Sequence, residues 1–364
     1  MKIAIYYDVP FGGAHIAMEE IILRLKKHNK IQIFKNQANT FNNFSPKRLW
    51  ADIESIVLQS FKQHQQAIKI DQGGFDLVFV SHDRHFQAPW ILRFLKTPTV
   101  FLCQEPTRAF FEKFLDVDPS LPLINKIYER INRWIRKGIE VKNAQFATKI
   151  VSNSKFSSKS ILNAYNRSST PIHMGVNTKN FFPLNLKQKN QVMVVGNNEP
   201  QKALSFTINC LSLINKTVRP KLVIVSPRSR DNRELLVLAR KKGVNIEILE
   251  GITVKHLCEV YNTSKILLAV AYLEPFGMSV IQSLACGTPV VAISEGGYVE
   301  TVIHQKTGLL VKRNSILIAK AISKLLQNSL LRKKMGKKGV LDVKRRFLWS
   351  HAVIKIEKIF YEVA

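Results

Sequence analysis

Short apolar runs alternate with helix-like stretches along most of this chain, and that alternation limits the possible folds more than any other feature. The apolar runs are bounded by turn residues, whereas the stretches between them carry apolar residues at helical spacing. This order predicts parallel β-strands joined by helices, and therefore an α/β protein. The expected strands are residues 2–7, 31–34, 77–80, 99–103, 149–154, 192–196, 221–226, 245–249, 265–271, 290–294 and 308–311.

A polar segment divides the expected strands into two series. Residues 171–191 contain two prolines and few regular signals, as expected of a connection between domains. The length of 364 residues also favours two domains over one. We therefore predict two Rossmann-like domains, over 1–182 and 183–345, that face each other across an interdomain cleft. In such sheets ligands bind beyond the carboxyl ends of the strands, so the loops that follow strands are the candidate sites.

The cysteines and the N-terminus indicate a protein of a reducing compartment. Cys103, Cys210, Cys258 and Cys286 form no C-x-x-C pair and have no histidine at metal-ligand spacing. We expect buried thiols, without a disulfide framework or a zinc site. Residues 1–14 resemble a first strand and a turn, unlike a signal peptide. Since no apolar run approaches the roughly 20 residues of a membrane-spanning helix, we expect a soluble or peripheral cytoplasmic protein.

The net charge of +29, from 55 basic and 26 acidic residues, is the one extreme value of the composition. It predicts attraction to a polyanion such as nucleic acid, anionic lipid or a phosphorylated substrate, while a lysine-rich solvated surface is the alternative explanation. Nucleic-acid binding lacks support, because no helix-turn-helix, RNP-like strand or zinc spacing occurs. A dinucleotide-dependent oxidoreductase is also disfavoured, since no G-x-G-x-x-G follows a strand.

The loop after the expected strand 265–271 has the chemistry of an anion site. It reads EPFGMSVIQ over 274–282 and leads into a helix. The first amides of a helix lack acceptors and carry partial positive charge, and Gly277 lets a ligand approach the main chain. Such a site suits a diphosphate. Glu274 would then face hydroxyl groups, and a helix-capping role is its alternative. The residues expected at the diphosphate are Phe276, Gly277, Met278 and Ser279.

The stretch 274–311 strongly resembles the retaining GT-B glycosyltransferases of family four. That family carries two glutamates with seven residues between them, followed by A-x-G-x-P-V-V, G-G-x-x-E and T-G-L-L-V segments. The three segments stand here at 285–291, 296–300 and 307–311, while Gln282 occupies the position of the second glutamate. The resemblance covers nearly the whole chain. It implies a GT-B fold in which the last helical segment, 346–364, packs back on the N-terminal domain.

The resemblance also identifies the start of the second domain. In the family, a strand ends in G-R-x-x-x-x-K-G, and its arginine and lysine grip the donor diphosphate. The corresponding residues 196–203 keep the lysine, Lys202, but have Asn197 at the position of the arginine. Lys202 can neutralise phosphate as a point charge, whereas the lost guanidinium removes a bidentate clamp.

Candidate residues of the N-terminal half follow strands as well. Gly12 and Gly13 resemble the family's Gly-Gly loop, which lies close to donor and acceptor. Gln104 lies in a segment similar to the family's C-H-E-P-x-R and replaces a histidine near the reacting centre. His82 and His85 follow a strand and are candidates for the acceptor side of the cleft, with packed or surface histidines as the alternative.

The resemblance implies transfer of a hexosyl group with retention, from a UDP-, GDP- or ADP-sugar to a glycan or lipid-linked acceptor, without a metal or other cofactor. Lys202 and the helix-start amides would stabilise the departing diphosphate. Glu274 would hold the sugar hydroxyls, and Gln282 the nucleotide ribose. Because three family positions differ, at Asn197, Gln104 and Gln282, a catalytically weak sugar-nucleotide-binding protein is the alternative. The assigned catalytic residues are Glu274, Lys202 and Gln104, and the assigned donor-binding residues are Gly12, Gly13, Asn197, Phe276, Gly277, Met278, Ser279 and Gln282.

Residues 124–142 combine an apolar stripe with many basic residues. One interpretation is an interfacial helix on an anionic membrane, with Trp134 at the head groups. The other is a helix that packs the stripe on the N-terminal sheet and leaves a solvated basic face. The membrane interpretation would put the protein on the inner face of the membrane and favour a lipid-linked acceptor. The stripe consists of Ile124, Ile127, Ile131, Trp134, Ile135 and Ile139.

Overall fold

The computed structural model describes residues 1–9, 12–35, 46–226 and 231–364, which form two compact units. The first unit comprises Met1–Ile172 and Val353–Ala364, and the second comprises His173–Ala352. The division thus falls at 172/173, whereas the sequence suggests 182/183. The reason is local, because Val176 forms a β-bridge with Leu348 and its amide donates to the carbonyl of Phe347 at 2.8 Å. These contacts tie the residues after 172 to the second unit.

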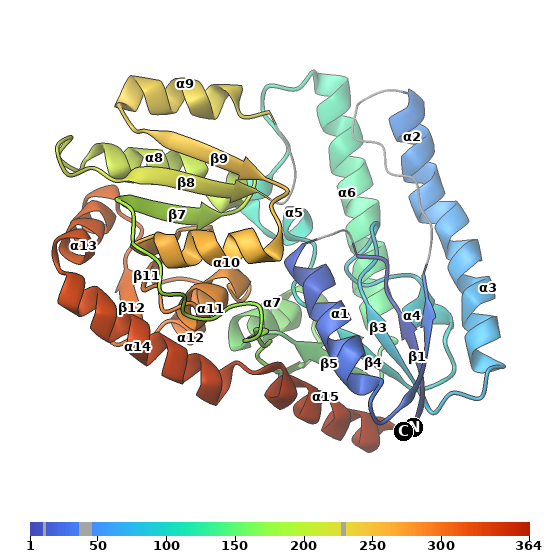
Figure 1. The fold of residues 1–364 in the computed structure, drawn as a ribbon. Coiled ribbons are helices and arrows are strands. Elements are labelled where there is room, and N and C mark those ends of the chain that lie inside the picture. Colours follow the sequence, from blue (N-terminus) through green and yellow to red (C-terminus); the bar gives the residue numbers. More distant parts are fainter. Residues whose placement is uncertain (10–11, 36–45, 227–230) are drawn as a thin grey trace. The chain divides into compact units, whose positions relative to one another are not determined.

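The first unit holds a six-stranded parallel sheet in the order β2-β1-β3-β4-β5-β6 (Figure 1). The central strands are apolar and buried on both faces, as expected of a parallel sheet covered by helices. The strands are β1 (Lys2–Tyr6), β2 (Lys30–Phe34), β3 (Leu77–Ser81), β4 (Thr99–Leu102), β5 (Lys149–Ser152) and β6 (Thr170–Pro171). The helical elements are α1 (Gly13–Leu25), α2 (Pro46–Ile53), η1 (Glu54–Leu58), α3 (Gln59–Asp71), α4 (Ile91–Phe94), α5 (Arg108–Phe111), η2 (Lys113–Leu115), α6 (Leu123–Ala144) and α7 (Lys155–Tyr165).

The second unit repeats this architecture with the strand order β12-β11-β10-β7-β8-β9. Its core includes a cluster of buried, mostly aliphatic residues from the sheet and from the helices that cover it. The strands are β7 (Gln191–Val195), β8 (Lys221–Ser226), β9 (Ile246–Glu250), β10 (Ile266–Ala269), β11 (Val290–Ile293) and β12 (Gly308–Val311). The helical elements are η3 (Pro200–Lys202), α8 (Leu204–Ser212), α9 (Arg233–Lys242), α10 (Val254–Thr263), α11 (Met278–Ala285), α12 (Tyr298–Thr301), α13 (Ser315–Gln327), α14 (Ser329–Arg346) and α15 (Trp349–Val363).

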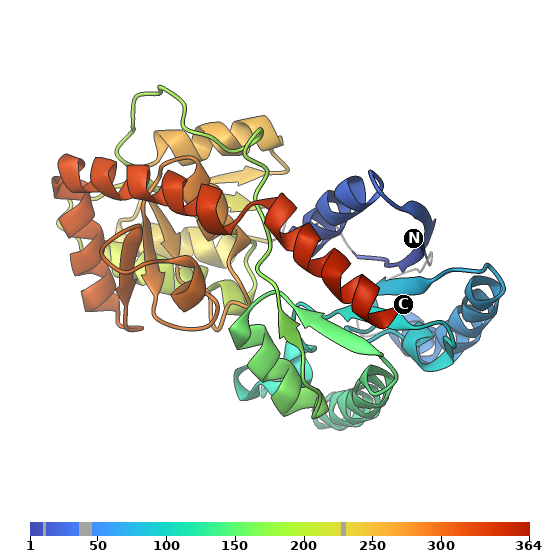
Figure 2. The ribbon, with the colours of Figure 1, turned by 90° about the horizontal axis from the view of Figure 1, so that it is seen from below.

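The C-terminal helix α15 begins in the second unit, and its residues from Val353 onward belong to the first (Figure 2). Phe360 of this helix is fully buried, and its ring meets that of Phe79 in β3 edge to face at 5.2 Å. The sequence places the returning segment at 346–364. In the structure, α14 extends to Arg346 before α15 starts at Trp349.

The predicted fold class is confirmed, since both units are Rossmann-like α/β sheets with parallel strands. All four cysteines are free and buried, as expected. Helix α4, between β3 and β4, is short. The Asp83 carboxylate accepts hydrogen bonds from the amides of His85 and Phe86, each at 2.8 Å, and such a local turn competes with helix formation.

The structure of helix α6 excludes one of the two interpretations of the stripe over 124–142. The stripe does not pack on the sheet, because Ile124, Ile131 and Trp134 are exposed. The buried residues of the helix are instead polar or small, namely Asn132, Glu140, Asn143 and Ala144. The expectation of a packed apolar stripe with a solvated basic face is therefore wrong.

The two strand orders determine where each sheet can bind a ligand. In the first unit, β1 lies between β2 and β3, so the strand order reverses beside β1. In the second unit, β7 lies between β8 and β10, and the order reverses there. Loops that leave neighbouring strands at such a point diverge and open a crevice. The loop after β1 holds Gly12 and Gly13, while the loops after β7 and β10 hold Lys202 and Glu274.

Candidate active site

The loops after β7 and β10 bring Lys202 and Glu274 together. The Lys202 Nζ donates to Glu274 Oε2 at 3.0 Å, and both side chains are partly exposed. A second contact joins the same loops, since the amide of Tyr272 donates to the carbonyl of Gln201 at 2.8 Å. The two charged residues that sequence analysis selected from distant motifs thus meet at the reversal of strand order.

The backbone around Glu274 is held in an unusual conformation. Leu273 has a φ of 44°, in the left-handed region that costs a non-glycine residue about 1–2 kcal/mol. The Gly-Gly turn at 296–297 packs directly on this backbone, and the Gly297 amide donates to the carbonyl of Glu274 at 2.7 Å. A Cβ added to Gly296 would lie 2.6 Å from the same carbonyl oxygen. The G-G-x-x-E segment therefore serves to hold the loop that carries Glu274.

Arg313 is a positioning residue that sequence analysis missed. Its guanidinium donates to the carbonyls of Val270 and Ala271, each at 3.0 Å, and pairs with Glu295 at 2.8 Å. It also stacks on the ring of Tyr272 at 3.8 Å. Arg313 thereby anchors the loop just before Glu274. The surrounding sequence contains no signal for this role, because the contacts join three separate loops.

Replacing Arg313 by methionine is expected to lower the free energy of unfolding by about 2–3 kcal/mol, because two carbonyls and a carboxylate lose their donor. Urea unfolding of the purified protein measures the change. The matched control is Arg233→Met, since Arg233 pairs with Asp231 on the surface and its side chain is 87% exposed. That control is expected to leave the unfolding midpoint unchanged, and equal midpoints for both variants would contradict the assigned role of Arg313.

Helix α11 begins directly after this loop and presents its first amides there. Gly277 has a φ of 94°, and a Cβ at this position would lie 2.9 Å from the ring of Tyr298. Both facts require glycine. Met278 and Ser279 are partly exposed in the first turn, whose amides have no acceptor within the helix. These residues therefore keep the geometry of an anion site.

The side chain of Phe276 is buried inside the second unit. It is 1% exposed and packs between the rings of His173 at 5.6 Å and Phe347 at 5.9 Å. His173 in turn contacts the Glu300 carboxylate at 2.8 Å. Only the backbone of Phe276 remains for the predicted contact with a diphosphate. Its ring, with His173 and Glu300, serves the packing of the second unit.

Gln282 lies further along α11 and is almost buried. Its Oε1 accepts a hydrogen bond from the hydroxyl of Tyr261 at 3.0 Å. Tyr261 is fully buried, and burial raises the pKa of its hydroxyl well above the usual value. The carbonyl of Gln282 is therefore engaged inside the protein, and its role toward a ribose stays a prediction.

Asn197 also has a partner within its own loop. Its side-chain amide donates to Glu199 Oε1 at 2.9 Å. The preceding Gly196 leaves room for the stem of Lys202, because an added Cβ would lie 3.0 Å from its Cγ. The loop after β7 therefore orients Lys202 through Gly196, while Asn197 holds the loop together.

The candidates of the first unit follow β1 and β4. Gly12 precedes α1, and its carbonyl accepts from the Ile16 amide at 3.0 Å, while Gly13 is the first residue of the helix. The neighbouring residues 10–11 of the expected Gly-Gly loop lie outside the described residues. Gln104 follows β4, and its Nε2 is buried without an acceptor among the residues that the structure describes.

His82 and His85 lie at the end of β3 in a mostly buried network. Burial lowers the pKa of His82 to about 4, so its imidazole is neutral at neutral pH. Burial also lowers the pKa of His85. Asp83 between them accepts hydrogen bonds from the buried Gln63 and from the amide of His85, each at 2.8 Å. These contacts favour a packed role for the pair, and a contact with an acceptor stays a prediction.

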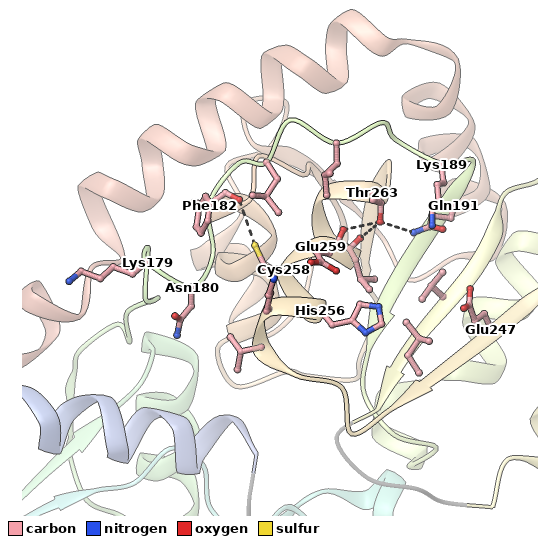
Figure 3. A pocket seen from close by; sticks show the side chains of 17 residues that line it. Lys179, Asn180, Phe182, Lys189, Gln191, Glu247, His256, Cys258, Glu259 and Thr263 are labelled. Atoms are coloured by element: carbon pink, nitrogen blue, oxygen red, sulfur yellow. Dashed lines mark hydrogen bonds between the residues drawn. The ribbon is translucent and has the colours of Figure 1, made fainter.

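A cavity of about 610 Å³ lies elsewhere in the second unit (Figure 3). It is bounded by the segment 179–189, by α10 and by strands β7 to β9, and residues such as Phe182, His256 and Cys258 line it. None of the sequence-predicted site residues lines this cavity. The Lys202–Glu274 pair therefore lies outside this cavity.

The described residues show neither a metal-binding cluster nor a membrane-spanning helix. They contain no group of three or more His, Cys, Asp or Glu that could hold a metal ion. Of the helices that the structure describes, none combines the length and the apolar character needed to cross a bilayer.

Residues 176–341 match the family model described as Glycosyl transferases group 1. This part of the chain is therefore similar to a glycosyl transferases group 1 domain. This domain contains the Lys202–Glu274 pair, the start of α11 and the Gly-Gly turn that holds them. The match covers the part of the chain that carries the four motifs, in agreement with the family expected from them.

A D-inositol 3-phosphate glycosyltransferase of Stackebrandtia nassauensis is 31% identical over 168 residues, which cover 43% of this chain and 38% of that protein. The chain therefore aligns with less than half the length of this relative. Sucrose-phosphate synthase from Thermosynechococcus elongatus superposes with a TM-score of 0.78 at 17% identity, covering 100% of this chain and 98% of the other. Anabaena HepE in complex with UDP and glucose gives a TM-score of 0.74 at 16% identity, with both chains fully covered. These likenesses show a shared GT-B fold.

Proposed function

We propose that this protein transfers a hexosyl group from a nucleotide-diphosphate sugar to a glycan or lipid-linked acceptor, with retention of configuration. The observation that carries the proposal is the Lys202–Glu274 pair at 3.0 Å, beside the first turn of α11. A cation, a carboxylate and unpaired helix amides at one point suit a donor with both phosphate and hydroxyl groups. The group 1 domain around them supports the same assignment.

The donor would use both members of the pair. As the bond between sugar and diphosphate breaks, negative charge develops on the leaving diphosphate. Lys202 and the amides of Gly277, Met278 and Ser279 would stabilise that charge. Glu274 would accept hydrogen bonds from the sugar hydroxyls and fix the ring for attack. Because Lys202 and Glu274 meet at 3.0 Å, a bound donor can take one on its phosphate side and the other on its sugar side.

Gln104 would contribute a hydrogen-bond donor from the first unit. Its buried Nε2 has no acceptor among the described residues, and an amide in that state is costly unless a ligand satisfies it. A glutamine cannot carry the proton that a histidine would carry at this position. We therefore assign Gln104 the task of orienting the reacting group. Gly12 and Gly13, at the start of α1, would contribute their backbone to donor binding.

One comparison supports a choice among the possible donor nucleotides. HepE, which shares the fold, was solved with UDP and glucose, and on that basis a UDP-sugar is the first donor to test, ahead of GDP- and ADP-sugars. The ribose contact would come from Gln282, whose side-chain nitrogen would donate while its carbonyl holds the Tyr261 hydroxyl. Asn197 would line the phosphate side without supplying charge.

The second candidate function is a catalytically weak protein that binds sugar nucleotides. It is favoured by two contacts, since Asn197 is engaged by Glu199 and Gln282 by the buried Tyr261. Both positions are charged in the family pattern and neutral here. A binding protein would keep the Lys202–Glu274 site but would release no nucleoside diphosphate.

Release of nucleoside diphosphate from a panel of UDP-, GDP- and ADP-sugars separates the two functions. The panel is run with and without a lipid extract and simple glycan acceptors, and donor binding is measured in parallel by calorimetry. Acceptor-dependent release from at least one donor is expected, with the anomeric configuration of the donor retained in the product. Binding without release would favour the binding protein, and neither binding nor release would refute both.

Transfer is expected to continue when divalent metal ions are removed. The proposed stabilisation of the diphosphate comes from Lys202 and from the first turn of α11, so neither charge depends on a metal. The measurement is the initial rate before and after treatment with EDTA, and again after Mg²⁺ or Mn²⁺ is added back. A rate that falls more than about tenfold with EDTA and recovers with either ion would contradict metal-independent catalysis.

For a lipid-linked acceptor, we propose that the protein works at the inner face of a membrane as a peripheral protein. The positive net charge of +29 and the exposed apolar residues of α6 support that location.

A further inference from the structure

Helix α6 turns its polar side to the protein. Glu140 is fully buried and accepts hydrogen bonds from the Tyr165 hydroxyl at 2.6 Å and from the Thr107 amide at 2.9 Å. Asn143 is also buried and donates to the carbonyl of Ala88 at 3.0 Å. These contacts fix the rotation of the helix about its axis. The opposite face must therefore be the exposed one.

The exposed face of α6 is apolar along its N-terminal half. Ile124 and Trp134 are 80% and 76% exposed. A helix on the surface of a globular protein normally shows the reverse arrangement, with the apolar stripe inside. The exposed apolar residues of this helix are Leu123, Ile124, Ile127, Ile131, Trp134 and Ile135.

The neighbouring helical segment α2–η1–α3 is inverted in the same way. Four of its polar residues, at helical spacing, are buried, while Trp50 and Phe61 are 59% and 65% exposed. The buried polar residues are Asp52, Ser55, Gln59 and Gln63. Between Leu49 and Phe61, the exposed apolar residues of the segment are Leu49, Trp50, Ile53, Val57, Leu58 and Phe61.

A polar seam joins the two inverted helices along their inner sides. The Asp52 carboxylate accepts hydrogen bonds from the Tyr128 hydroxyl at 2.7 Å, from the Asn132 amide at 3.1 Å and from Arg136 at 3.3 Å. Arg136 donates to the Ser55 hydroxyl at 3.0 Å as well. The seam holds α2 and α6 side by side, as Figure 1 shows. We call the exposed apolar residues of the two helices, named above, the apolar helix surface.

Basic residues accompany the apolar helix surface. Arg130 and Lys137 are exposed on α6 beside the stripe, and Lys142 follows them toward the end of the helix. The chain as a whole carries a net charge of +29. Trp50 and Trp134 contribute the side chain that settles most readily between lipid head groups and acyl chains. Apolar and aromatic residues with a basic border are complementary to an anionic bilayer.

We propose that the apolar helix surface docks this protein on an anionic lipid bilayer, with both helices lying in the head-group region. A protein partner would cover the apolar residues, but it would leave the basic border and the large positive charge unexplained. A large exposed apolar patch on a soluble chain indicates an interaction site in either case. The docking does not depend on the proposed function. If both hold, a lipid-linked acceptor would lie in the same bilayer on which the enzyme docks.

Co-sedimentation with vesicles tests the proposal on the full chain. Phosphatidylglycerol–phosphatidylcholine vesicles are compared with pure phosphatidylcholine vesicles, using the wild type, Trp134→Asp and the double variant Ile131→Asp/Trp134→Asp. Each aspartate is expected to lower partitioning to anionic vesicles at least about tenfold, because it removes an inserted apolar side chain and adds a repelled charge. The matched control is Leu330→Asp on α14, whose side chain is 78% exposed in the second unit. It is expected to bind as the wild type does.

The electrostatic part is tested by charge reversal and by salt. The variant Arg130→Glu/Lys137→Glu is expected to bind anionic vesicles at least about tenfold more weakly. Raising salt from about 0.1 M to about 1 M shortens the screening length from about 10 Å to about 3 Å and is expected to weaken wild-type binding. The substituted residues are exposed, so circular dichroism and the unfolding midpoint are expected to match the wild type.

The outcomes separate this inference from the proposed function. Donor binding, measured by calorimetry on the same variants, is expected to stay within about twofold of the wild type, because the donor residues lie in other elements. Absence of wild-type binding to anionic vesicles, or equal binding by the control and the α6 variants, would overturn the docking proposal. A concentration-dependent dimer that Trp134→Asp abolishes, without vesicle binding, would assign the surface to a second copy. Absence of donor binding, with normal vesicle binding, would refute the proposed transfer and would not affect the docking proposal.

Discussion

Replacing Glu274 by alanine is expected to reduce transfer at least about 100-fold, while the protein stays folded. The carboxylate is proposed to hold the sugar hydroxyls in the position needed for attack, and loss of one such preorganised contact commonly costs 10²–10³ in rate. The fold should survive, because Glu274 is partly exposed and its carbonyl, which accepts from the Gly297 amide at 2.7 Å, is retained. The measurement is kcat and KM for the best donor in the panel.

The control for this variant is Glu247→Ala. Glu247 forms an ion pair with Lys221 at 2.6 Å in the same unit, so its removal costs a similar contact away from the site. Its kcat is expected to equal that of the wild type. Full turnover by Glu274→Ala would contradict the role assigned to the carboxylate. A loss confined to KM would instead indicate that Glu274 binds the ground state and the transition state equally.

The architecture could be predicted from the sequence because each strand is a short apolar run and each βα loop has a recognisable turn. Glu274 was selected from the loop after an expected strand and Lys202 from the resemblance to the family's lysine motif, and the reversal of strand order brings their two loops together. The Gly-Gly turn at 296–297 was visible as a motif. Its purpose, which is to pack on the backbone of Glu274, needed the three-dimensional contact.

The residues that the sequence could not place depend on long-range contacts. Arg313 anchors the loop before Glu274 through backbone carbonyl groups. Because every residue has such a carbonyl, the sequence does not indicate which ones an arginine contacts. Phe276 stands at the helix start where a ligand contact was expected, yet its ring fills a space beside His173. Gln282 is turned inward by one hydroxyl group, that of Tyr261. In each case the deciding partner is distant in the chain.

Helix α6 shows a different limit of sequence analysis. Its periodicity predicted an amphipathic helix, but periodicity alone does not say which face is inside. The apolar stripe would normally be buried, and here a buried Glu140 and the seam at Asp52 reverse that assignment. The polar residues with these partners were scattered among basic residues and appeared to be solvated. Only the hydrogen bonds of the inner face reveal that the apolar face remains outside.

Replacing Lys202 by methionine is expected to weaken donor binding and to reduce kcat, with a combined loss of about 100-fold or more in kcat/KM. Two effects add. The leaving diphosphate loses a neutralising cation, and Glu274, whose carboxylate lies 3.0 Å from the Lys202 ammonium, then faces the phosphate with an unbalanced charge. The second effect predicts a specific non-additivity. In the Lys202→Met background, Glu274→Gln should restore part of the donor affinity, although it lowers turnover in the wild type.

A double-mutant cycle on these two positions measures that coupling directly. Donor dissociation constants are determined for the wild type, both single variants and the double variant. The matched control is Lys221→Met, which removes the lysine of the separate ion pair with Glu247 and should leave donor affinity unchanged. Strictly additive effects would mean that Lys202 and Glu274 contact the donor independently. Undiminished donor affinity of the Lys202→Met variant would show that Lys202 does not contact the diphosphate. The partial positive charge of the α11 amides would then account for the binding of the diphosphate.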